Sequence, residues 1–212
     1  MHLQNLEMIK HVIFSLFFFF TCSIFAQNFD IDALKEINVE RNKSLDPTFK
    51  FITNSNSYVN IGTPIIVFAT GLIAKDGSLR MKGILLAESM FVSTLITTTM
   101  KYTIKRERPF TTYDFIDKQA TGGSPSFPSG HTSSAFSTAT SLSIAFPKWY
   151  VIAPSFLWAS SVGYSRMHLG VHYPSDVIVG AVIGSGSAFL CNQVNKWVVN
   201  DIRNKRKNAF KL

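Results

Sequence analysis

The sequence is poor in cysteine and in charged residues. Among 212 residues there are two cysteines, and only 16% of the side chains are charged. So few cysteines exclude a disulfide-stapled scaffold, and an apolar content of 46% excludes a disordered chain. Cys191 lies in an apolar stretch, so we expect no disulfide even in an oxidising compartment. One folded domain is expected.

Acidic residues are the scarcer of the two charge types. There are 13 Asp and Glu against 21 Lys and Arg, which gives a formal net charge of +8. Taken alone, this excess suggests nucleic acid, a membrane surface or an anionic small molecule as a partner. The mean hydropathy of +0.16 is too low for uniformly Leu-rich membrane spans, but it allows spans rich in Ser, Thr and Gly. The distribution of residues along the chain has to decide.

The amino-terminal segment has the pattern of an export signal. An apolar run over residues 12–20 follows a short lead with one base, and small residues then lead to Ala26 before a polar stretch. This order predicts a secretory signal peptide over residues 1–26, with Ala26 the last residue removed. An uncleaved membrane anchor and a lipoprotein signal at Cys22 are the alternatives. Export follows from each of them.

The rest of the chain is predicted to be an all-α helical bundle. Residues 29–56 are polar with apolar residues three or four apart, which predicts an amphipathic helix interrupted near Pro47. Five segments of helix length with few charges follow: 61–74, 83–100, 132–146, 149–164 and 177–199. Gly180 and Gly184 suit close helix packing. We therefore expect one helical domain over 27–200 and a basic cytoplasmic tail over 201–212.

Charge placement favours a polytopic membrane protein with about five spans. Several segments are shorter than the roughly 20 residues of a straight span, so a soluble exported bundle is the alternative. If all five cross and the mature chain starts outside, the basic residues of 75–82, Lys148 and those of the tail all fall inside. The loops 101–131 and 166–176 then share the outer face. We predict the bacterial inner membrane with these loops facing the periplasm, and a soluble periplasmic protein as the alternative.

The first outer loop opens with a basic cluster. Lys101, Lys105, Arg106 and Arg108 are four cations within eight positions that hold one acid. On a helix end, Lys101, Lys105 and Arg108 share a face. Basic residues beside a membrane normally lie on the inner side, so this outer position favours a role in binding an anion. Lys supplies a point charge and Arg a planar fork that can hold two phosphate oxygens.

The same loop ends in a turn-rich stretch, 122–131, that leads into a helix near Thr132. Ser129 and Gly130 precede that helix, whose first turn presents free N–H groups and a positive dipole end to an anion. His131 follows directly. On its own, such a histidine would more often be structural than chemical.

The second outer loop holds isolated charges. Asp176 is the only carboxylate between Asp117 and Asp201, and Arg166 is the only Lys or Arg between Lys148 and Lys196. Asp176 is predicted in the first turn of the last helix, within reach of His172. A carboxylate bonded to one imidazole nitrogen leaves the other nitrogen free as a base, a nucleophile or a metal ligand.

Two histidines, one aspartate, several cations and a helix start predict a phosphate pocket with a nucleophile and an acid. A metal centre fits less well, because the acidic ligands of a binuclear hydrolase are missing, and we expect no metal and no other cofactor. His168 is expected to be structural. We expect no nucleic acid partner, since export and the lack of a basic face with interleaved aromatics argue against it.

Three motifs together resemble a known family. Their residues are Lys101-x6-Arg108-Pro109, then Pro128-Ser129-Gly130-His131, then Ser165-Arg166-x5-His172-x3-Asp176. In order and spacing they resemble the signature of the type 2 phosphatidic acid phosphatase superfamily, which also includes bacterial acid phosphatases and vanadium haloperoxidases. All three motifs are intact.

The resemblance implies a role for each motif residue. His172 would attack phosphorus and form a phosphohistidine while Asp176 holds its ring, and His131 would protonate the leaving oxygen and later activate water. The phosphoryl oxygens would be held by Lys101, Arg108, Arg166, Ser129 and the Gly130 N–H. Lys105 and Arg106 lie outside the motifs, where either could meet an acidic lipid head group.

The function expected from this resemblance is a membrane phosphatase that hydrolyses a lipid phosphate or pyrophosphate. Undecaprenyl pyrophosphate, phosphatidic acid and phosphatidylglycerol phosphate are the substrates considered, with membrane lipid as the surrounding partner. The alternative is a soluble exported acid phosphatase acting on small phosphoesters. A vanadate-dependent peroxidase is disfavoured by the short chain. A transporter or structural membrane protein whose basic residues only bind lipid is the alternative from another class.

Overall fold

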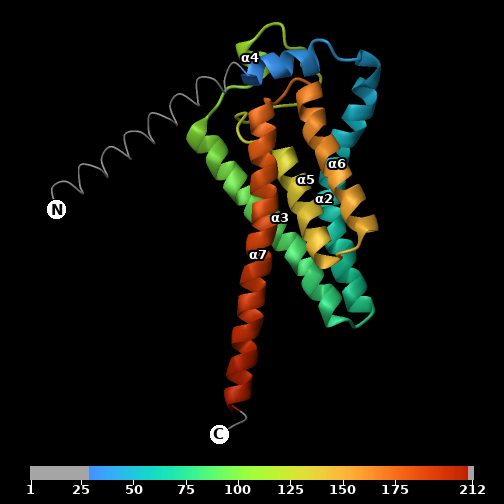
Figure 1. The fold of residues 1–212 in the computed structure, drawn as a ribbon, viewed down its shortest axis with the longest axis vertical. Coiled ribbons are helices and arrows are strands. Elements are labelled where there is room, and N and C mark those ends of the chain that lie inside the picture. The colour runs from blue at the N-terminus through green and yellow to red at the C-terminus, as the bar shows by residue number, and fades with distance from the viewer. Residues whose placement is uncertain (1–28, 210–212) are drawn as a thin grey trace, which may run out of the picture.

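The computed structural model describes the backbone of residues 29–209 and the side chains of residues 29–201. Within that part of the chain all regular structure is helical (Figure 1). A helix over 29–38 precedes η1 (Lys43–Leu45), α2 (Asp46–Ile73), α3 (Gly77–Ile104), α4 (Pro109–Thr112), α5 (Gly130–Ala145), α6 (Trp149–His168) and α7 (Pro174–Ala209). The predicted signal peptide over residues 1–26 lies outside the described residues and stays a prediction.

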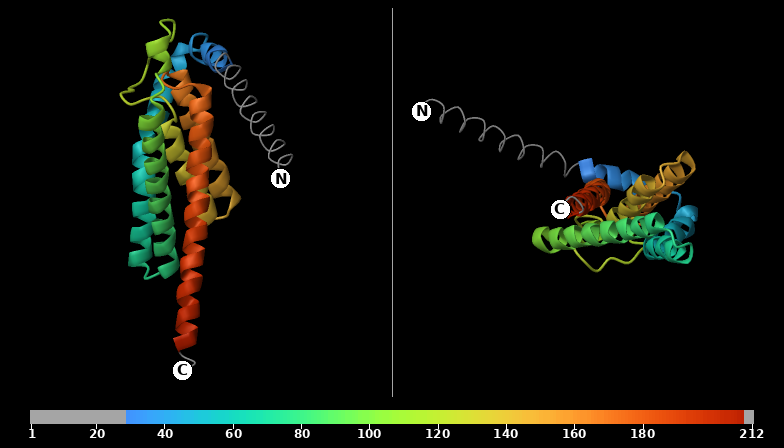
Figure 2. Two further views of the ribbon diagram at one scale, coloured as in Figure 1. Left: turned by 90° about the vertical axis from the view of Figure 1, so that its left-hand side faces the viewer. Right: turned by 90° about the horizontal axis from the view of Figure 1, so that it is seen from below.

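Helix α5 forms the centre of the bundle. It packs against α7, α6 and α3, and the view along the bundle shows these helices around it (Figure 2). With 16 residues it is ~24 Å long, shorter than its neighbours. Most of its Ser and Thr side chains are buried, and several donate to carbonyls one turn earlier, as Ser141 does to Ser137 at 2.7 Å. Small hydroxyl side chains that satisfy themselves in this way let the surrounding helices approach closely.

The glycines of α7 permit the closest of these contacts. A Cβ atom at Gly180 would lie 2.7 Å from the Ser129 carbonyl oxygen, and one at Gly184 would clash with the Ser133 carbonyl. The predicted close packing at Gly180 and Gly184 is therefore confirmed. Because the starts of α5 and α7 touch, the Ser129 N–H donates to the Asp176 carbonyl at 2.9 Å. This contact brings two of the three sequence motifs together.

Three of the described helices are long and apolar enough to cross a membrane: Lys43–Ile73, Gly77–Thr112 and Pro174–Asp201. Large apolar side chains point outward from the bundle, among them Phe91 at 67% exposure and Leu157 at 70%. The protein is a helical membrane protein, and the soluble alternative is not supported. All five predicted segments are helices, and three of the described helices meet both the length and the hydropathy of a membrane span.

The amino-terminal part differs from the single amphipathic helix expected over 29–56. The helix over 29–38 lies across one end of the bundle, and α2 begins separately at Asp46 (Figure 1). Pro47 lies in the first turn of α2 instead of interrupting a helix. The N–H groups of the first turn make no hydrogen bond within the helix, so proline, which lacks this N–H, costs no bond there. At the other end, α7 continues to Ala209, so the predicted tail boundary at residue 201 does not coincide with a helix end.

Candidate active site

The three motifs converge at the end of the bundle where α3 and α6 finish and α5 and α7 begin. Lys101 lies in the last turn of α3, Arg166 in the last turn of α6, and Arg108 just before α4. They line a cavity of about 280 Å³ together with Gly130, His131, His172 and the loop 121–124. Residues separated by up to 71 positions in the chain thus share one small polar pocket.

His172 and Asp176 form a buried pair at the pocket wall. The distance between His172 Nδ1 and Asp176 Oδ2 is 3.2 Å, and both side chains are almost fully buried. Oδ2 also accepts hydrogen bonds from the Ser126 hydroxyl at 2.5 Å and from the Tyr173 N–H at 3.0 Å. A carboxylate with this many donors is firmly oriented, and it holds the imidazole in turn.

The partners of His172 define which ring nitrogen carries the proton and which accepts. Arg108 Nη1 lies 3.4 Å from His172 Nε2, and because a guanidinium only donates, Nε2 is the acceptor and Nδ1 carries the proton toward Asp176. Burial, opposed by Asp176 and assisted by the charges of Arg108 and Arg166, lowers the pKa of His172 to about 3. The ring is therefore neutral near pH 7, with the lone pair of Nε2 on the pocket side.

The three pocket cations are oriented by neutral oxygens. Arg108 donates to the Ser124 carbonyl at 2.8 Å and the Val171 carbonyl at 2.7 Å, and Lys101 donates to the Pro125 carbonyl at 2.6 Å. Within the described part of the chain, none of the three is in a salt bridge with a carboxylate. Carbonyls orient a cation without cancelling its charge, so the pocket keeps a strong positive potential for an anion.

Arg166 has hydrogen-bonding capacity to spare. It donates to the Thr53 hydroxyl at 2.6 Å and to the Thr121 carbonyl at 3.2 Å, and its buried Nε–H has no partner among the described residues. A buried donor without an acceptor is costly. An anion in the pocket would supply that acceptor.

His131 and the start of α5 complete the pocket. Burial, followed by the charges of Arg166, Arg108 and Lys101, lowers the pKa of His131 to about 3. Gly130 lines the cavity. Ser129 is fully buried instead. Its Oγ caps α5 by accepting from the Thr132 N–H at 3.4 Å, and it also accepts from the Thr132 hydroxyl at 2.8 Å.

Arg106 and His168 lie outside the three motifs, and each pairs with a carboxylate of the amino-terminal part of the chain. Arg106 does not project toward lipid: it donates to Asp176 Oδ1 and to Asp30 Oδ2, each at 2.8 Å. His168 Nε2 lies 2.8 Å from Asp46 Oδ1, away from the pocket. Its structural role stands. Both partners, Asp30 and Asp46, lie in the amino-terminal segment, where the sequence contains no motif.

Several residues in contact with the site were not anticipated from the sequence. Ser126 bonds to Asp176, Thr53 to Arg166, and Asp30 reaches the site through Arg106. Ser126 lies three residues before Ser129 and could have been suspected from that proximity. Thr53 and Asp30 carry no such signal, because only the fold brings them near the motifs.

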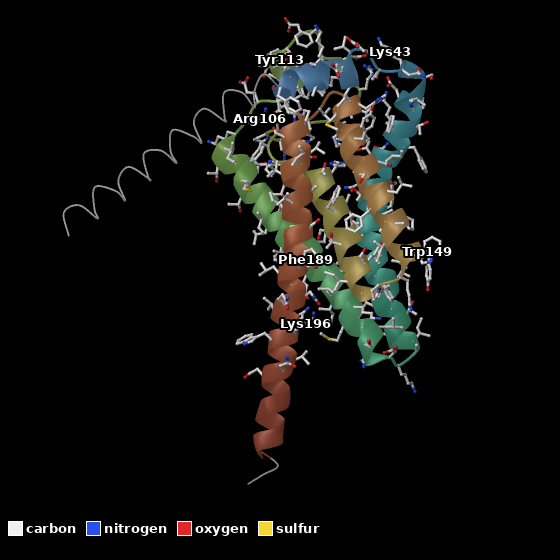
Figure 3. All side chains as sticks on the ribbon, in the orientation of Figure 1. Lys43, Arg106, Tyr113, Trp149, Phe189 and Lys196 are labelled. Atoms are coloured by element: carbon white, nitrogen blue, oxygen red, sulfur yellow. The ribbon has the colours of Figure 1, made fainter. Side chains whose placement is uncertain are left out.

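A larger cavity exists elsewhere in the molecule. It measures about 380 Å³, lies between α3, α5 and α7, and is lined by Lys82 and Lys196 among others. Figure 3 shows that Lys196, on α7, lies far from Arg106, which is at the end of the bundle that holds the motifs. This cavity contains neither pocket histidine, so the chemistry, not the size, identifies the site. Among the described residues, no three His, Cys, Asp or Glu side chains are grouped so that they could hold a metal ion.

A neutral histidine held by a carboxylate and facing three cations, at one end of a membrane-embedded helical bundle, has the features of a phosphatase site. The PAP2 superfamily matches residues 82–199, and the chain belongs to this superfamily. The resemblance based on the three motifs is thus confirmed, and the protein is a membrane phosphatase.

Named relatives support the assignment over most of the chain. An undecaprenyl-diphosphatase of Sulfolobus acidocaldarius is 32% identical over 171 residues, which is 78% of each protein. A lipid A 4'-phosphatase of Bacteroides thetaiotaomicron is 36% identical over 84 residues, 40% of this chain and 37% of that protein.

Two solved structures are similar throughout the bundle. Aquifex aeolicus LpxE has a TM-score of 0.70 and 28% identity, with 78% of this chain and 95% of that one covered. The transmembrane PAP2 type phosphatidylglycerolphosphate phosphatase of Bacillus subtilis has a TM-score of 0.71 and 26% identity, with 87% and 96% covered.

Proposed function

We propose that the protein hydrolyses a lipid phosphate or lipid pyrophosphate through a phosphohistidine on His172. The observation that carries this proposal is the orientation of His172: Asp176 holds Nδ1, and Nε2 is left on the side of a cavity lined by three cations. The names of the relatives, an undecaprenyl-diphosphatase and lipid A phosphatases, support a phosphorylated lipid as the substrate class.

In the first step, the lone pair of His172 Nε2 attacks phosphorus and the bond from phosphorus to the lipid oxygen breaks. The charge that develops on the phosphoryl oxygens is stabilised by Lys101, Arg108 and Arg166, with the free Nε–H of Arg166 as an added donor. His131, on the same cavity, gives its proton to the leaving lipid oxygen.

In the second step, water attacks the phosphohistidine and the P–N bond breaks. His131, now neutral, takes the proton of that water, so inorganic phosphate leaves and both histidines return to their starting states. His131 must be protonated at the start, although the empty pocket holds its pKa at about 3. The negative charge of the bound phosphate offsets the three cations and raises that pKa, so substrate binding prepares the acid.

The pocket is proposed to face the periplasm. The opposite end of the bundle carries Lys75, Arg80, Lys82 and Lys148, and positively charged loops favour the cytoplasmic side. This topology is tested with a membrane-impermeant maleimide in spheroplasts, on a chain whose Cys22 and Cys191 are replaced by serine. A cysteine at exposed Asp114 should react and one at exposed Lys75 should not; the reverse result would invert the topology.

The activity is tested on detergent-purified protein with undecaprenyl pyrophosphate, lipid A, phosphatidic acid, phosphatidylglycerol phosphate and a small soluble phosphomonoester. Release of phosphate from at least one lipid in preference to the soluble ester is expected. A reaction with labelled lipid phosphate that is quenched in alkali should trap an alkali-stable, acid-labile phosphoprotein, and His172→Ala should abolish it. Preference for the soluble ester would overturn the lipid assignment, and trapping on another residue would overturn the mechanism.

A further inference from the structure

Arg106 lies behind the His172–Asp176 pair and outside the phosphate cavity. Its Nη1 donates to Asp176 Oδ1 at 2.8 Å and its Nη2 donates to Asp30 Oδ2 at 2.8 Å. Both carboxylates are buried, with side-chain exposures of 0% for Asp176 and 5% for Asp30. The guanidinium therefore joins the carboxylate of the nucleophile pair to a carboxylate on the helix over 29–38.

Further contacts hold Arg106 in this position. Its guanidinium stacks over the Tyr173 ring at 3.8 Å, and Nη1 also donates to the Ser175 hydroxyl at 2.7 Å. Asp30 in turn accepts from the Ser175 N–H at 2.8 Å and from the Ser175 hydroxyl. The Ser175 N–H belongs to the first turn of α7, where it has no acceptor within the helix. Asp30 therefore fixes both the arginine and the helix start that carries Asp176.

The two oxygens of Asp176 have separate duties in this arrangement. Oδ2 accepts from His172 and Ser126, whereas Oδ1 accepts from Arg106. A carboxylate held at only one oxygen can turn about its terminal torsion, and the ring bonded to it turns with it. The single bond from Arg106 Nη1 to Oδ1 opposes that rotation and balances the carboxylate charge, while Nη2 is held by Asp30.

We propose that Arg106, anchored by Asp30, is a positioning residue for the His172 nucleophile, so that the helix over 29–38 is part of the catalytic apparatus. This inference rests on the proposed function of His172. Arg106 touches neither the cavity nor the phosphate, and it acts through Asp176 alone. The amino-terminal helix is thus coupled to the chemistry by one salt-bridged chain, from Asp30 to Arg106 to Asp176 to His172.

The inference has an electrostatic consequence that a purely structural role would lack. The charged groups around His172 are Asp176 on α7, Arg108 before α4 and Arg166 on α6, with Arg106 behind Asp176. Removing the Arg106 charge leaves the Asp176 charge uncompensated, which favours the imidazolium. The pKa of His172 then rises, and the acid limb of the kcat/KM profile moves to higher pH.

The test compares Arg106→Gln and Asp30→Asn with Lys105→Asn in the purified enzyme. Lys105 is an exposed neighbouring cation with φ of 53°, a conformation that asparagine tolerates, so this control removes the same charge without touching the network. We expect kcat to fall ~10- to 100-fold in Arg106→Gln and less in Asp30→Asn, and the acid limb to rise in Arg106→Gln, because only that variant removes the Arg106 charge. The control should match the wild type.

A binding measurement separates positioning from pocket damage. Inhibition by inorganic phosphate reports the cation pocket, so its Ki should change less than ~3-fold in Arg106→Gln while Arg108→Gln raises it strongly. A parallel rise of Ki and loss of kcat in Arg106→Gln would overturn the proposal. So would wild-type kcat and pH profile in both network variants, or failure of both to fold, which would make the network purely structural.

Failure of the proposed function is distinguishable from failure of this inference. A wild-type enzyme that is inactive on every phosphorylated lipid overturns the function. In that case the pH dependence of His172 acylation by diethyl pyrocarbonate, read by peptide mass spectrometry, still measures the His172 pKa. An upward shift in Arg106→Gln supports the coupling, and an unchanged titration in that variant rejects it.

Discussion

Two charged networks built from the same residue types lie at the same end of the bundle, and they differ in whether the chain supplies the counter-charge. The N-terminal clamp consists of Arg41, Asp46, Asp117 and His168. Arg41 pairs with Asp46 at 2.8 Å and with Asp117 at 2.7 Å, and Asp46 also lies 2.8 Å from His168 Nε2. Asn38 adds bonds to the Asp117 and His168 carbonyls. In the clamp each charge faces an opposite charge or a ring nitrogen.

The phosphate pocket is the opposite case. Its cations Lys101, Arg108 and Arg166 face carbonyls, hydroxyls and neutral histidines, and one guanidinium N–H has no partner in the described structure. The comparison teaches that burial and residue type do not separate a structural charge network from a functional one. The absent counter-charge does, because a substrate anion has to supply it.

The largest effect is expected from replacing the histidine of each network, His172 in the pocket and His168 in the clamp. His172→Gln removes the proposed nucleophile and should lower kcat by a factor of ~10⁴ or more, while the thermal midpoint in detergent stays near that of the wild type. His168→Gln should leave kcat within ~3-fold and lower the thermal midpoint, because it removes one of the partners of Asp46. Phosphate release and thermal unfolding are measured on both.

Equal losses of activity in the two histidine variants would contradict the division into a clamp and a pocket. Loss of folding in His172→Gln would be checked with His172→Asn, which retains a shorter hydrogen-bond donor for Asp176.

The second prediction sharpens the comparison at its arginines. Arg166→Gln should lower kcat/KM by ~10²- to 10³-fold, because it removes the guanidinium charge and the unpartnered Nε–H that would stabilise the developing phosphoryl charge. Arg41→Gln should mainly destabilise the fold, since it leaves Asp46 and Asp117 without their cation. Steady-state kinetics and thermal unfolding of both variants give a crossed pattern, and activity loss in Arg41→Gln without destabilisation would refute the assignment.

The pocket side of this comparison was predictable from the sequence. Lys101, Arg108, His131, Arg166, His172 and Asp176 form spaced motifs, and helix ends place such motifs at one end of a bundle. The five helical segments were predictable for a similar reason, because runs of low charge bounded by basic turns have few other structures available.

The clamp side was not predictable. Asn38, Arg41 and Asp46 look like an ordinary polar linker, and their partners Asp117 and His168 lie about 70 to 130 residues further on. No local pattern encodes such pairs. Arg106 was misassigned for the same physical reason: a cation beside a predicted membrane surface looks free until the fold places Asp30 next to it. The central position of α5 in the bundle was also not predicted, since Ser and Thr are equally common in exposed helices.

The third prediction concerns protons instead of rates. The pKa of His131 is lowered to about 3 by burial and by the pocket cations, so the empty enzyme carries it neutral. A bound phosphate offsets those cations and raises the pKa, so binding of inorganic phosphate near pH 6 should take up protons, up to about one at His131. Calorimetry in buffers of different ionisation enthalpy measures this uptake.

The matched controls come from the two networks. Protonation of the phosphate itself is common to all variants, so the difference between the wild type and His131→Asn isolates the histidine. His168→Asn, in the clamp, should take up as many protons as the wild type. Equal uptake in the wild type and His131→Asn would mean that His131 is not the acid prepared by the substrate.

The smallest expected effect lies where α2 supports the pocket. Thr53 accepts from Arg166 Nη1 at 2.6 Å, while Arg166 keeps a second bond to the Thr121 carbonyl. Thr53→Val preserves the shape of the side chain and removes only the acceptor, so kcat/KM should fall ~3- to 10-fold, less than for loss of the arginine itself. Thr63→Val on the same helix is the control, because its hydroxyl bonds only to the Val59 carbonyl. If the kcat/KM of Thr53→Val equals that of the control, Arg166 is held by the loop alone, and α2 contributes to the membrane bundle but not to the pocket. If it falls as far as that of Arg166→Gln, the guanidinium depends on Thr53 for its orientation, and α2 is as much a part of the proposed phosphate site as the three motifs.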